Sequence, residues 1–400
     1  MLASIVLLGS IVCQESAPAS RPDPASRPAE TRPAKLQLGP ATPAELIPAA
    51  IERLLECQDN GAWPYEGVYR DASRQIPTGY RVGGTALACT ALLYAAPPDD
   101  KKVGEAIERG VAYILKTLED PSLAMSVAEN YDVRIWGHAC ALEIFSHLKA
   151  KKRLGAHAKE IEKWIPELVK IITEEEIEGG GWNYATHKTP ASFVTVPVVQ
   201  SLLFAKEQGA AVPKDLVDRA AEALRIQRLE TGAFVYDSRD PSIAKPNPNA
   251  KKANAQVSPT STVPGACARS AACEAMLSIL GRGDPKNLKG SIDAFFENWD
   301  ELEKRRKKTG THEGPYRIAP YYFYYGHRYA AQAIELLPKE ARAKERERML
   351  ETLLRTRDDD GTWNDRQFPR SRAYGTSMAI LVLLQDRQPI PQSQPLNLKR

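Results

Sequence analysis

The chain has 400 residues, enough for one large domain or two small ones. Its hydrophobic share, 43%, is ordinary for a globular protein and can fill a sizeable core. The 54 basic and 50 acidic residues leave a net charge of only +4, which argues against a nucleic-acid-binding protein. We therefore expect no nucleic acid among its partners.

The first residues, 1–19, have the pattern of a secretory signal peptide. Residues 1–12 are apolar but too short to span a bilayer. Ala17 and Ala19 flank Pro18 in the small-residue pattern that signal peptidase cleaves. We therefore expect an exported protein, periplasmic or secreted. No other stretch of the sequence is long and apolar enough to predict a membrane span.

The composition and patterning of the remaining sequence predict three further segments. Residues 20–41 are rich in Pro, Ala, Ser and Arg and have few large apolar residues, which predicts a disordered spacer. Residues 42–386 carry helical patterns throughout and predict a single helical domain. Residues 387–400 form a C-terminal tail.

Amphipathic helices recur along the predicted domain. The first begins with Thr42, Pro43 and Glu45, which predict a capping box with Pro at the first helical position. Similar patterns cover residues 103–114 and 161–172, and others begin near Pro213, Pro285 and Pro338. An apolar stripe on one side suits an outer helix that has its other side in water.

Between them lie segments that are small and apolar nearly all round, as expected for helices buried on every side. We expect these inner helices to begin at turns before Gly84, Gly137, Val194, Gly265, Gly326 and Gly375, about 50 to 70 residues apart. Alternating outer and inner helices predict an all-α fold, an α/α-toroid of six helical hairpins. The alternative is a helical stack that stays open.

A second repeat lies between outer and inner helices. It combines Gly with an aromatic residue two positions later, at Trp63, Trp182, Phe234, Tyr316 and Trp363. The Gly permits a positive φ after the helix, and the ring can then pack across the junction.

These features resemble the squalene cyclase and prenyltransferase repeat superfamily, whose members share a Gln-x-x-Gly-x-Trp-like junction motif. The match is full at Gln58-Asp59-Asn60-Gly61-Ala62-Trp63 and partial at the other copies, over roughly residues 43–386. The resemblance implies the toroidal architecture. It implies little about activity, since one fold supports many functions.

The catalytic residues that the resemblance implies are incomplete here. The acidic motif of class II terpene cyclases has its nearest match in Asp358-Asp359-Asp360, which we expect to form a helix-ending turn. The zinc site of protein prenyltransferases retains Cys267 and His327, but Gly265 stands where an Asp ligand belongs. We therefore expect no cofactor, with Cys267 and His327 as the only zinc candidates.

Two repeated positions mark a candidate site at the mouth of the ring. His138 and His327 each follow the glycine of an inner helix, and Tyr324 and Tyr325 precede His327 in a run of aromatic residues that we expect outside the helix. Each His either packs locally or contacts a ligand. Aromatic surfaces at a mouth suit sugars and other flat ligands.

The second position holds arginine three residues before the repeat glycine, at Arg81, Arg134 and Arg372. One interpretation is an anion site, because helix N-termini favour anions. In the other interpretation, each Arg links neighbouring hairpins through an ion pair with an acid such as Asp132 or Asp365. Two long segments, 236–263 and 301–325, are expected to overhang a mouth.

We therefore predict a protein that binds a small-molecule or glycan-like ligand, or a partner, at the mouth of the central cavity. The alternative is an enzyme that acts on a terpenoid or a carbohydrate. Carbohydrate enzymes need paired carboxylates. The inner-helix starts supply none, and the acids Glu143, Glu274 and Glu335 lie deeper in the sequence of each helix.

Export is testable by mass spectrometry of the protein from its native source. We expect cleavage near Ala19, so that the mature chain lacks residues 1–17. An intact N-terminus recovered from a cytosolic fraction would contradict the prediction.

Overall fold

The computed structural model describes residues 42–67, 75–123, 133–184, 188–237 and 257–391. All of them belong to one compact unit, Gly39–Arg400. The predicted signal peptide (1–19) and spacer (20–41) lie outside the described residues. So do Asp132, most of segment 236–263 and residues 392–400 of the predicted tail.

The described residues form α-helices joined by loops and short 3₁₀ turns. The α-helices are α1 (Pro43–Glu56), α2 (Thr78–Ala95), α3 (Lys101–Leu118), α4 (Arg134–Ala150), α5 (Ala158–Glu174), α6 (Ser192–Glu207), α7 (Lys214–Ile226), α8 (Val263–Ile279), α9 (Pro285–Glu297), α10 (Trp299–Glu303), α11 (Tyr322–Glu335), α12 (Lys339–Leu354) and α13 (Ser371–Leu383).

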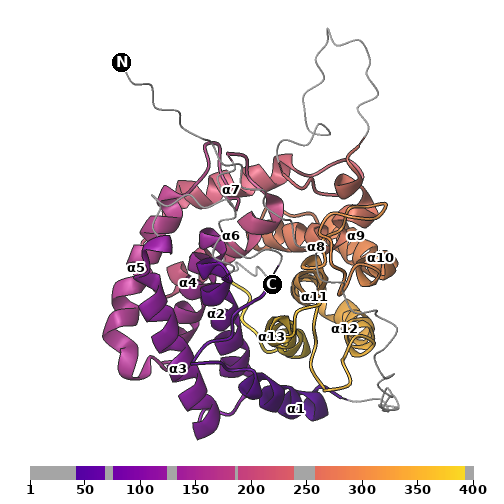
Figure 1. The fold of residues 1–400 in the computed structure, drawn as a ribbon. Coiled ribbons are helices and arrows are strands. Elements are labelled where there is room, and N and C mark those ends of the chain that lie inside the picture. Colours follow the sequence, from indigo (N-terminus) through magenta and orange to yellow (C-terminus); the bar gives the residue numbers. More distant parts are fainter. Residues whose placement is uncertain (1–41, 68–74, 124–132, 185–187, 238–256, 392–400) are drawn as a thin grey trace, which may run out of the picture. The chain divides into compact units, whose positions relative to one another are not determined.

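The inner helices contact one another in a closed cycle. Helix α2 packs on α4, α4 on α6, α6 on α8, α8 on α11, α11 on α13, and α13 again on α2. Helices α1, α3, α5, α7, α9 and α12 lie outside this cycle (Figure 1). The predicted all-α toroid is therefore confirmed. The count of six hairpins stays a prediction, since the outer layer beside α8 is divided between α9 and the short α10.

The two kinds of helix differ in burial as the sequence predicts. Helix α3 buries Val103, Ile107, Val111 and Ile114 as one stripe, whereas α2 is buried on nearly every side. Helix α1 starts with the predicted capping box, in which the Thr42 backbone N–H donates to Glu45 Oε2 at 2.8 Å. Among the described helices, none has the length and apolar character that crossing a bilayer requires.

The inner helices begin earlier than we expected. Helix α2 starts at Thr78 and α11 at Tyr322, so the repeat glycines lie inside the helices and do not mark turns. A Cβ on Gly137 would lie 2.9 Å from the Cα of Gly79, too close for any side chain. Gly79 and Gly137 thus let α2 and α4 approach each other. The expectation that the tyrosine run precedes the helix was therefore wrong.

The junction between outer and inner helices has the predicted geometry. Gly61 and Gly361 have φ of +84° and +83°, in the region that favours glycine. A Cβ on Gly61 would lie 3.1 Å from the carbonyl oxygen of Arg109 on α3, so the junction also contacts the next outer helix.

Each junction tryptophan makes the same two hydrogen bonds. The indole N–H of Trp63 donates to the Leu54 carbonyl of α1 at 2.7 Å, and its backbone N–H donates to Thr85 Oγ1 of α2 at 3.0 Å. Trp182 and Trp363 repeat both bonds with the preceding outer helix and the following inner helix. All three indoles are fully buried. Each tryptophan thus fixes the spacing of one hairpin.

The loss of an indole donor should therefore cost stability. We expect Trp63→Phe, Trp182→Phe and Trp363→Phe each to lower the free energy of unfolding by roughly 0.5–1.5 kcal/mol, because one buried hydrogen bond to a helix carbonyl is lost. Urea unfolding measures the change, with the half-buried Trp164→Phe on α5 as the matched control. Junction variants no less stable than the control would contradict this role.

Candidate functional site

An aromatic pocket lies at the N-terminal ends of the inner helices. It encloses about 590 Å³, part of it open to solvent. Its described lining consists of aromatic residues and two valines: Tyr65, Tyr80, Val133, Trp136, Tyr184, Phe193, Val194, Tyr321, Tyr325 and Tyr374. No charged side chain lines the pocket within the described part of the chain. We call this site the aromatic pocket.

Two groups of rings face the pocket. On one side Tyr65 stacks on Tyr374 with centroids 4.0 Å apart, and Tyr80 meets Trp136 edge-on at 5.6 Å. On the other side Phe193 packs against Tyr184, Tyr321 and Tyr322. Rings held by their neighbours present faces whose orientation is fixed before a ligand arrives.

The junction repeat places several of these groups. Two residues after the junction aromatic, the chain holds Tyr65, Tyr184, Tyr236 and Asp365 in four of the repeats. Tyr65 and Tyr184 line the pocket. Tyr236 and Asp365 lie directly behind the lining, and each is hydrogen-bonded to a lining tyrosine. This register was not recognised from the sequence, although the spacing from each junction aromatic carries the signal.

Hydroxyl groups on the second side form a chain. The Tyr236 hydroxyl lies 2.7 Å from that of Tyr184 and 3.3 Å from that of Tyr321. The Tyr325 hydroxyl donates to the Phe193 carbonyl at 3.2 Å. These bonds satisfy phenol groups that would otherwise be costly to bury, and they hold the rings in place.

Asp365 is the buried carboxyl group of this region. The Tyr65 hydroxyl donates to Asp365 Oδ2 at 3.2 Å, while Oδ1 is buried without a hydrogen-bond partner. Burial raises the pKa of Asp365 to about 7, although the charge of Arg366 lowers it. A carboxyl group with such a pKa beside a pocket is a typical feature of a functional site.

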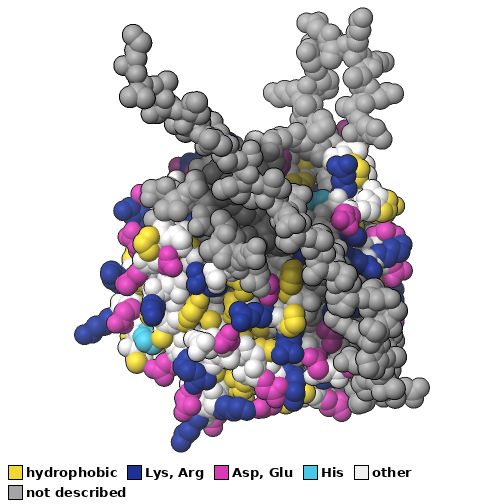
Figure 2. Space-filling model, in the orientation of Figure 1, with side chains coloured by type: hydrophobic (Ala, Val, Ile, Leu, Met, Phe, Trp, Pro, Cys, Tyr) yellow, Lys and Arg dark blue, Asp and Glu magenta, His cyan; other side chains and the backbone are white. Residues whose placement is uncertain are grey.

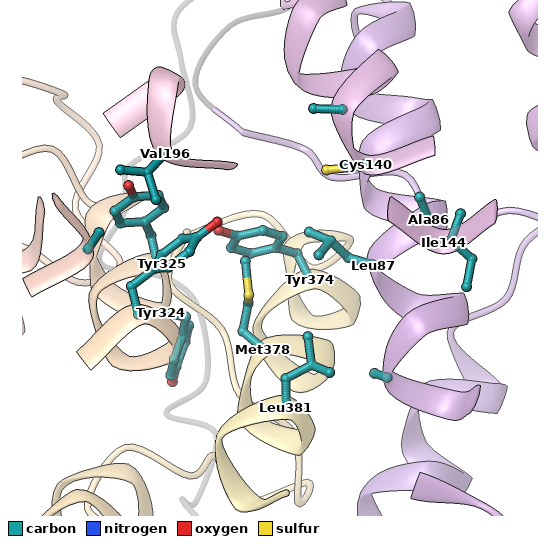
Figure 3. Packing of buried hydrophobic residues seen from close by; sticks show 14 of the residues in the cluster. Ala86, Leu87, Cys140, Ile144, Val196, Tyr324, Tyr325, Tyr374, Met378 and Leu381 are labelled. Carbon is teal, nitrogen blue, oxygen red and sulfur yellow. The ribbon is translucent and has the colours of Figure 1, made fainter. Parts of the chain in front are cut away.

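Of the predicted tyrosines, one lies in the pocket. Tyr325 lines it, and Figure 3 shows Tyr325 and Tyr374 turned toward each other. Tyr324, one residue earlier on α11, points elsewhere, and its hydroxyl donates to Thr356 Oγ1 at 3.3 Å. Consecutive helical residues differ by about 100° in direction, so both could not face the pocket.

The two predicted histidines lie between the inner and outer helices. The indole N–H of Trp299 donates to His327 Nε2 at 2.9 Å, so Nδ1 carries the proton and donates to the Phe323 carbonyl at 2.7 Å. Burial lowers the pKa of His327 to about 4. His138 is buried with Nδ1 3.8 Å from Glu175 Oε2. Neither His lines the aromatic pocket.

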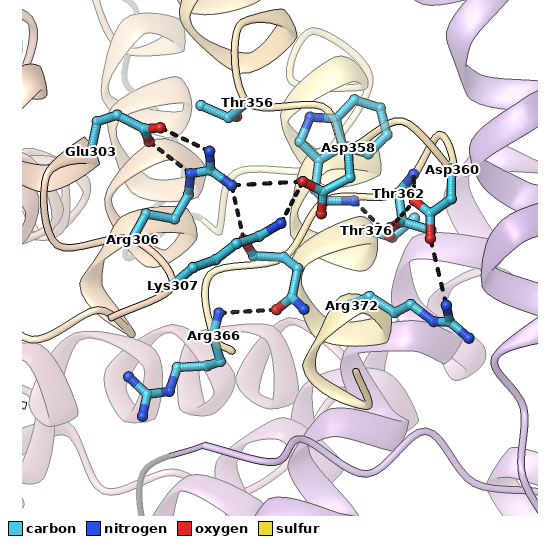
Figure 4. A network of polar contacts seen from close by, with 12 residues as sticks. Glu303, Arg306, Lys307, Thr356, Asp358, Asp360, Thr362, Arg366, Arg372 and Thr376 are labelled. Carbon is cyan, nitrogen blue, oxygen red and sulfur yellow. Dashed lines mark hydrogen bonds and ion pairs between the residues drawn. The ribbon is translucent and has the colours of Figure 1, made fainter. Parts of the chain in front are cut away.

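The three predicted arginines do not line one common pocket. Arg81 donates to Thr78 Oγ1 at 2.8 Å and lines an outer groove beside Arg109. Arg134 is the half-buried first residue of α4. Arg372 is exposed and lies 3.5 Å from Asp360 (Figure 4). None of the three lines the aromatic pocket, and the anion-binding mouth stays a prediction.

The zinc candidates do not share a site with other ligands. Cys267 is buried on α8, and both ring nitrogens of His327 are taken by protein partners. Nowhere in the described ranges do three or more His, Cys, Asp and Glu side chains gather as metal ligands would.

The opposite end of the inner helices is polar. Glu143 pairs with Arg328 and lies 3.7 Å from His147 Nε2. Although burial alone would raise it, Arg328 and His147 hold the pKa of Glu143 at about 2. The residues around Gln388 cover this end. Glu143, Glu274 and Glu335 are thus each paired with an arginine and lie away from the aromatic pocket.

The described residues thus form an α/α-toroid with an aromatic pocket at one mouth. Among solved structures, the chain is similar to a variant of the type II terpene cyclase MstE from Scytonema, in complex with geranylgeranyl dihydroxybenzoate. The two share 13% identity over 86% of this chain and 97% of that one, with a TM-score of 0.52.

Two further structures are similar. An inactive variant of the α-1,6-mannanase GH76A from Salegentibacter sp. HEL1_6, in complex with α-1,6-mannotriose, shares 12% identity over 86% of this chain and 99% of that one (TM-score 0.52). The Lin0763 protein from Listeria innocua shares 12% identity over 86% of this chain and 97% of that one (TM-score 0.51). No family model and no curated protein sequence matches the chain. At these identities the likeness shows the α/α-toroid fold alone.

The pKa of Asp365 predicts a pH-dependent stability. Its ordinary value is 3.8, so the unfolded chain releases this proton from about pH 4 and the folded chain only near pH 7. Asp365 therefore destabilises the fold increasingly as pH rises through this window. We expect Asp365→Asn to gain roughly 2–3 kcal/mol over the parent protein between pH 5 and pH 8.

Urea unfolding at both pH values measures the difference. Asp359→Asn, an exposed acid six residues earlier, is the matched control and should follow the parent. A gap between Asp365→Asn and the parent that stays constant with pH would contradict the raised pKa.

Proposed function

We propose that the protein binds a small molecule with a flat or ring-shaped, largely apolar body in the aromatic pocket. The observation that carries the proposal is the convergence of Tyr65, Trp136, Phe193, Tyr325 and Tyr374 on one space at the mouth. Ligand sites are typically concave and aromatic with a few placed polar groups. Here the lining hydroxyls supply those groups.

The chemistry of the lining also limits the class of ligand that the pocket can bind. Arg81 and Arg372 lie on outer surfaces, and the described lining contains no basic side chain. An acidic head group would find no partner among these residues. A ring system without an acidic group, such as a prenylated aromatic compound or a glycan, fits the rings and hydroxyls better.

The structural neighbours support ligands of this kind, since one is in complex with a prenylated dihydroxybenzoate and another with mannotriose. Membership of the squalene cyclase and prenyltransferase repeat superfamily remains part of the proposal, as does export. An enzyme acting on a terpenoid or carbohydrate is supported less, because no pair of carboxylates lines the pocket within the described residues.

Calorimetry with two ligands tests the proposal. We expect the full chain to bind a prenylated hydroquinone or α-1,6-mannotriose, and Trp136→Ala to weaken that binding by about tenfold or more, since ring stacking is lost. Trp164→Ala on α5 is the control and should bind as the parent does. The proposal fails if neither ligand binds, or if both tryptophan variants bind like the parent.

A further inference from the structure

The aromatic pocket combines electron-rich ring faces with a buried carboxyl group. A ring face carries partial negative charge and attracts a cation placed above it. The pocket presents such faces from two sides, with Tyr65, Tyr80, Trp136 and Tyr374 opposite Phe193 and its neighbours. The described lining offers no cationic side chain that would already occupy them.

Asp365 adds a full charge to this arrangement when it is ionised. It lies one hydrogen bond behind Tyr65, is fully buried, and has one carboxylate oxygen without a partner. In a site of low dielectric, a charge at this distance still acts on a ligand across the ring.

Positive groups near Asp365 are already engaged elsewhere. Arg366 donates to the Gly67 carbonyl at 2.9 Å, and Arg306 pairs with Glu303 at 2.7 Å (Figure 4). The other titratable groups that interact with Asp365 are the phenols of Tyr65, Tyr374 and Tyr324. Burial raises the pKa of each further above its ordinary value, so all three are neutral at physiological pH. Burial raises the pKa of Asp365 in spite of both arginines, so its carboxylate is under-compensated in the folded protein.

We infer that the ligand of the aromatic pocket carries a cationic centre, in the simplest case an alkylated ammonium group, held by the ring faces and by the Asp365 carboxylate. This inference rests on the proposed function, because it names the ligand class of the same pocket. The apolar body of the ligand packs on the rings, and the positive centre faces Tyr65 and Tyr374.

Binding and protonation are then linked. A cation that favours the ionised carboxylate lowers the pKa of Asp365, and by reciprocity its affinity rises as Asp365 ionises. Each unit by which the pKa falls corresponds to a tenfold preference for the ionised form. Affinity for a cation should therefore increase between pH 6 and pH 8, while a neutral ligand of the same shape shows no such gain.

Choline and 3,3-dimethyl-1-butanol test this directly, because they differ only in having nitrogen or carbon at the branched centre. Titration calorimetry of the full chain at pH 8 should show choline binding about tenfold or more tightly than the neutral alcohol. The preference should shrink at pH 6. It should be lost in Asp365→Asn and retained in Asp359→Asn, which changes an exposed acid of the same loop.

The outcomes separate this inference from the proposed function. Equal binding of choline and the alcohol at both pH values overturns the inference that the ligand is cationic. Binding of the prenylated hydroquinone or mannotriose would still support the proposed function of the aromatic pocket. If Asp365→Asn does not fold, the pH dependence of the choline preference in the parent protein decides alone. A preference that is the same at pH 6 and pH 8 then overturns the role of Asp365.

Discussion

The structure depends on one repeated interaction, the double hydrogen bond of a buried tryptophan between an outer and an inner helix. Trp63 donates to the carbonyl of Leu54 on one side and to the hydroxyl of Thr85 on the other. The first bond gives a second donor to a carbonyl at the end of α1, which also accepts from the backbone N–H of Cys57. Because Trp182 and Trp363 repeat the arrangement, the same geometry sets three hairpins around the ring.

The pocket follows from that constraint. Once the tryptophan is fixed, the chain runs on toward the mouth, and the residue two positions later reaches the centre or the layer directly behind it. Tyr65 and Tyr184 arrive there as lining rings, and Asp365 arrives as a carboxyl group. The same register that holds the hairpins together thus determines which side chains a ligand meets.

The sequence predicts much of the fold because helix periodicity and junction glycines are local signals. The stripe from Val103 to Ile114 and the positive φ of Gly61 both appear as expected. Of the site residues predicted from the sequence, Tyr325 alone lines the aromatic pocket. Side-chain direction depends on where a helix begins, and placing the start of α11 too late put Tyr324 in the mouth together with Tyr325. The burial of Asp365 arises from tertiary packing, which residue spacing alone does not reveal.

A crystal structure of the full chain with a bound prenylated hydroquinone, mannotriose or choline tests the central claim most directly. The account predicts the ligand within van der Waals contact, about 4 Å, of Trp136 and Tyr325 in the aromatic pocket. A ligand found instead in the outer groove beside Arg81, or at the polar end beside Arg328, with the aromatic pocket unchanged, would contradict it.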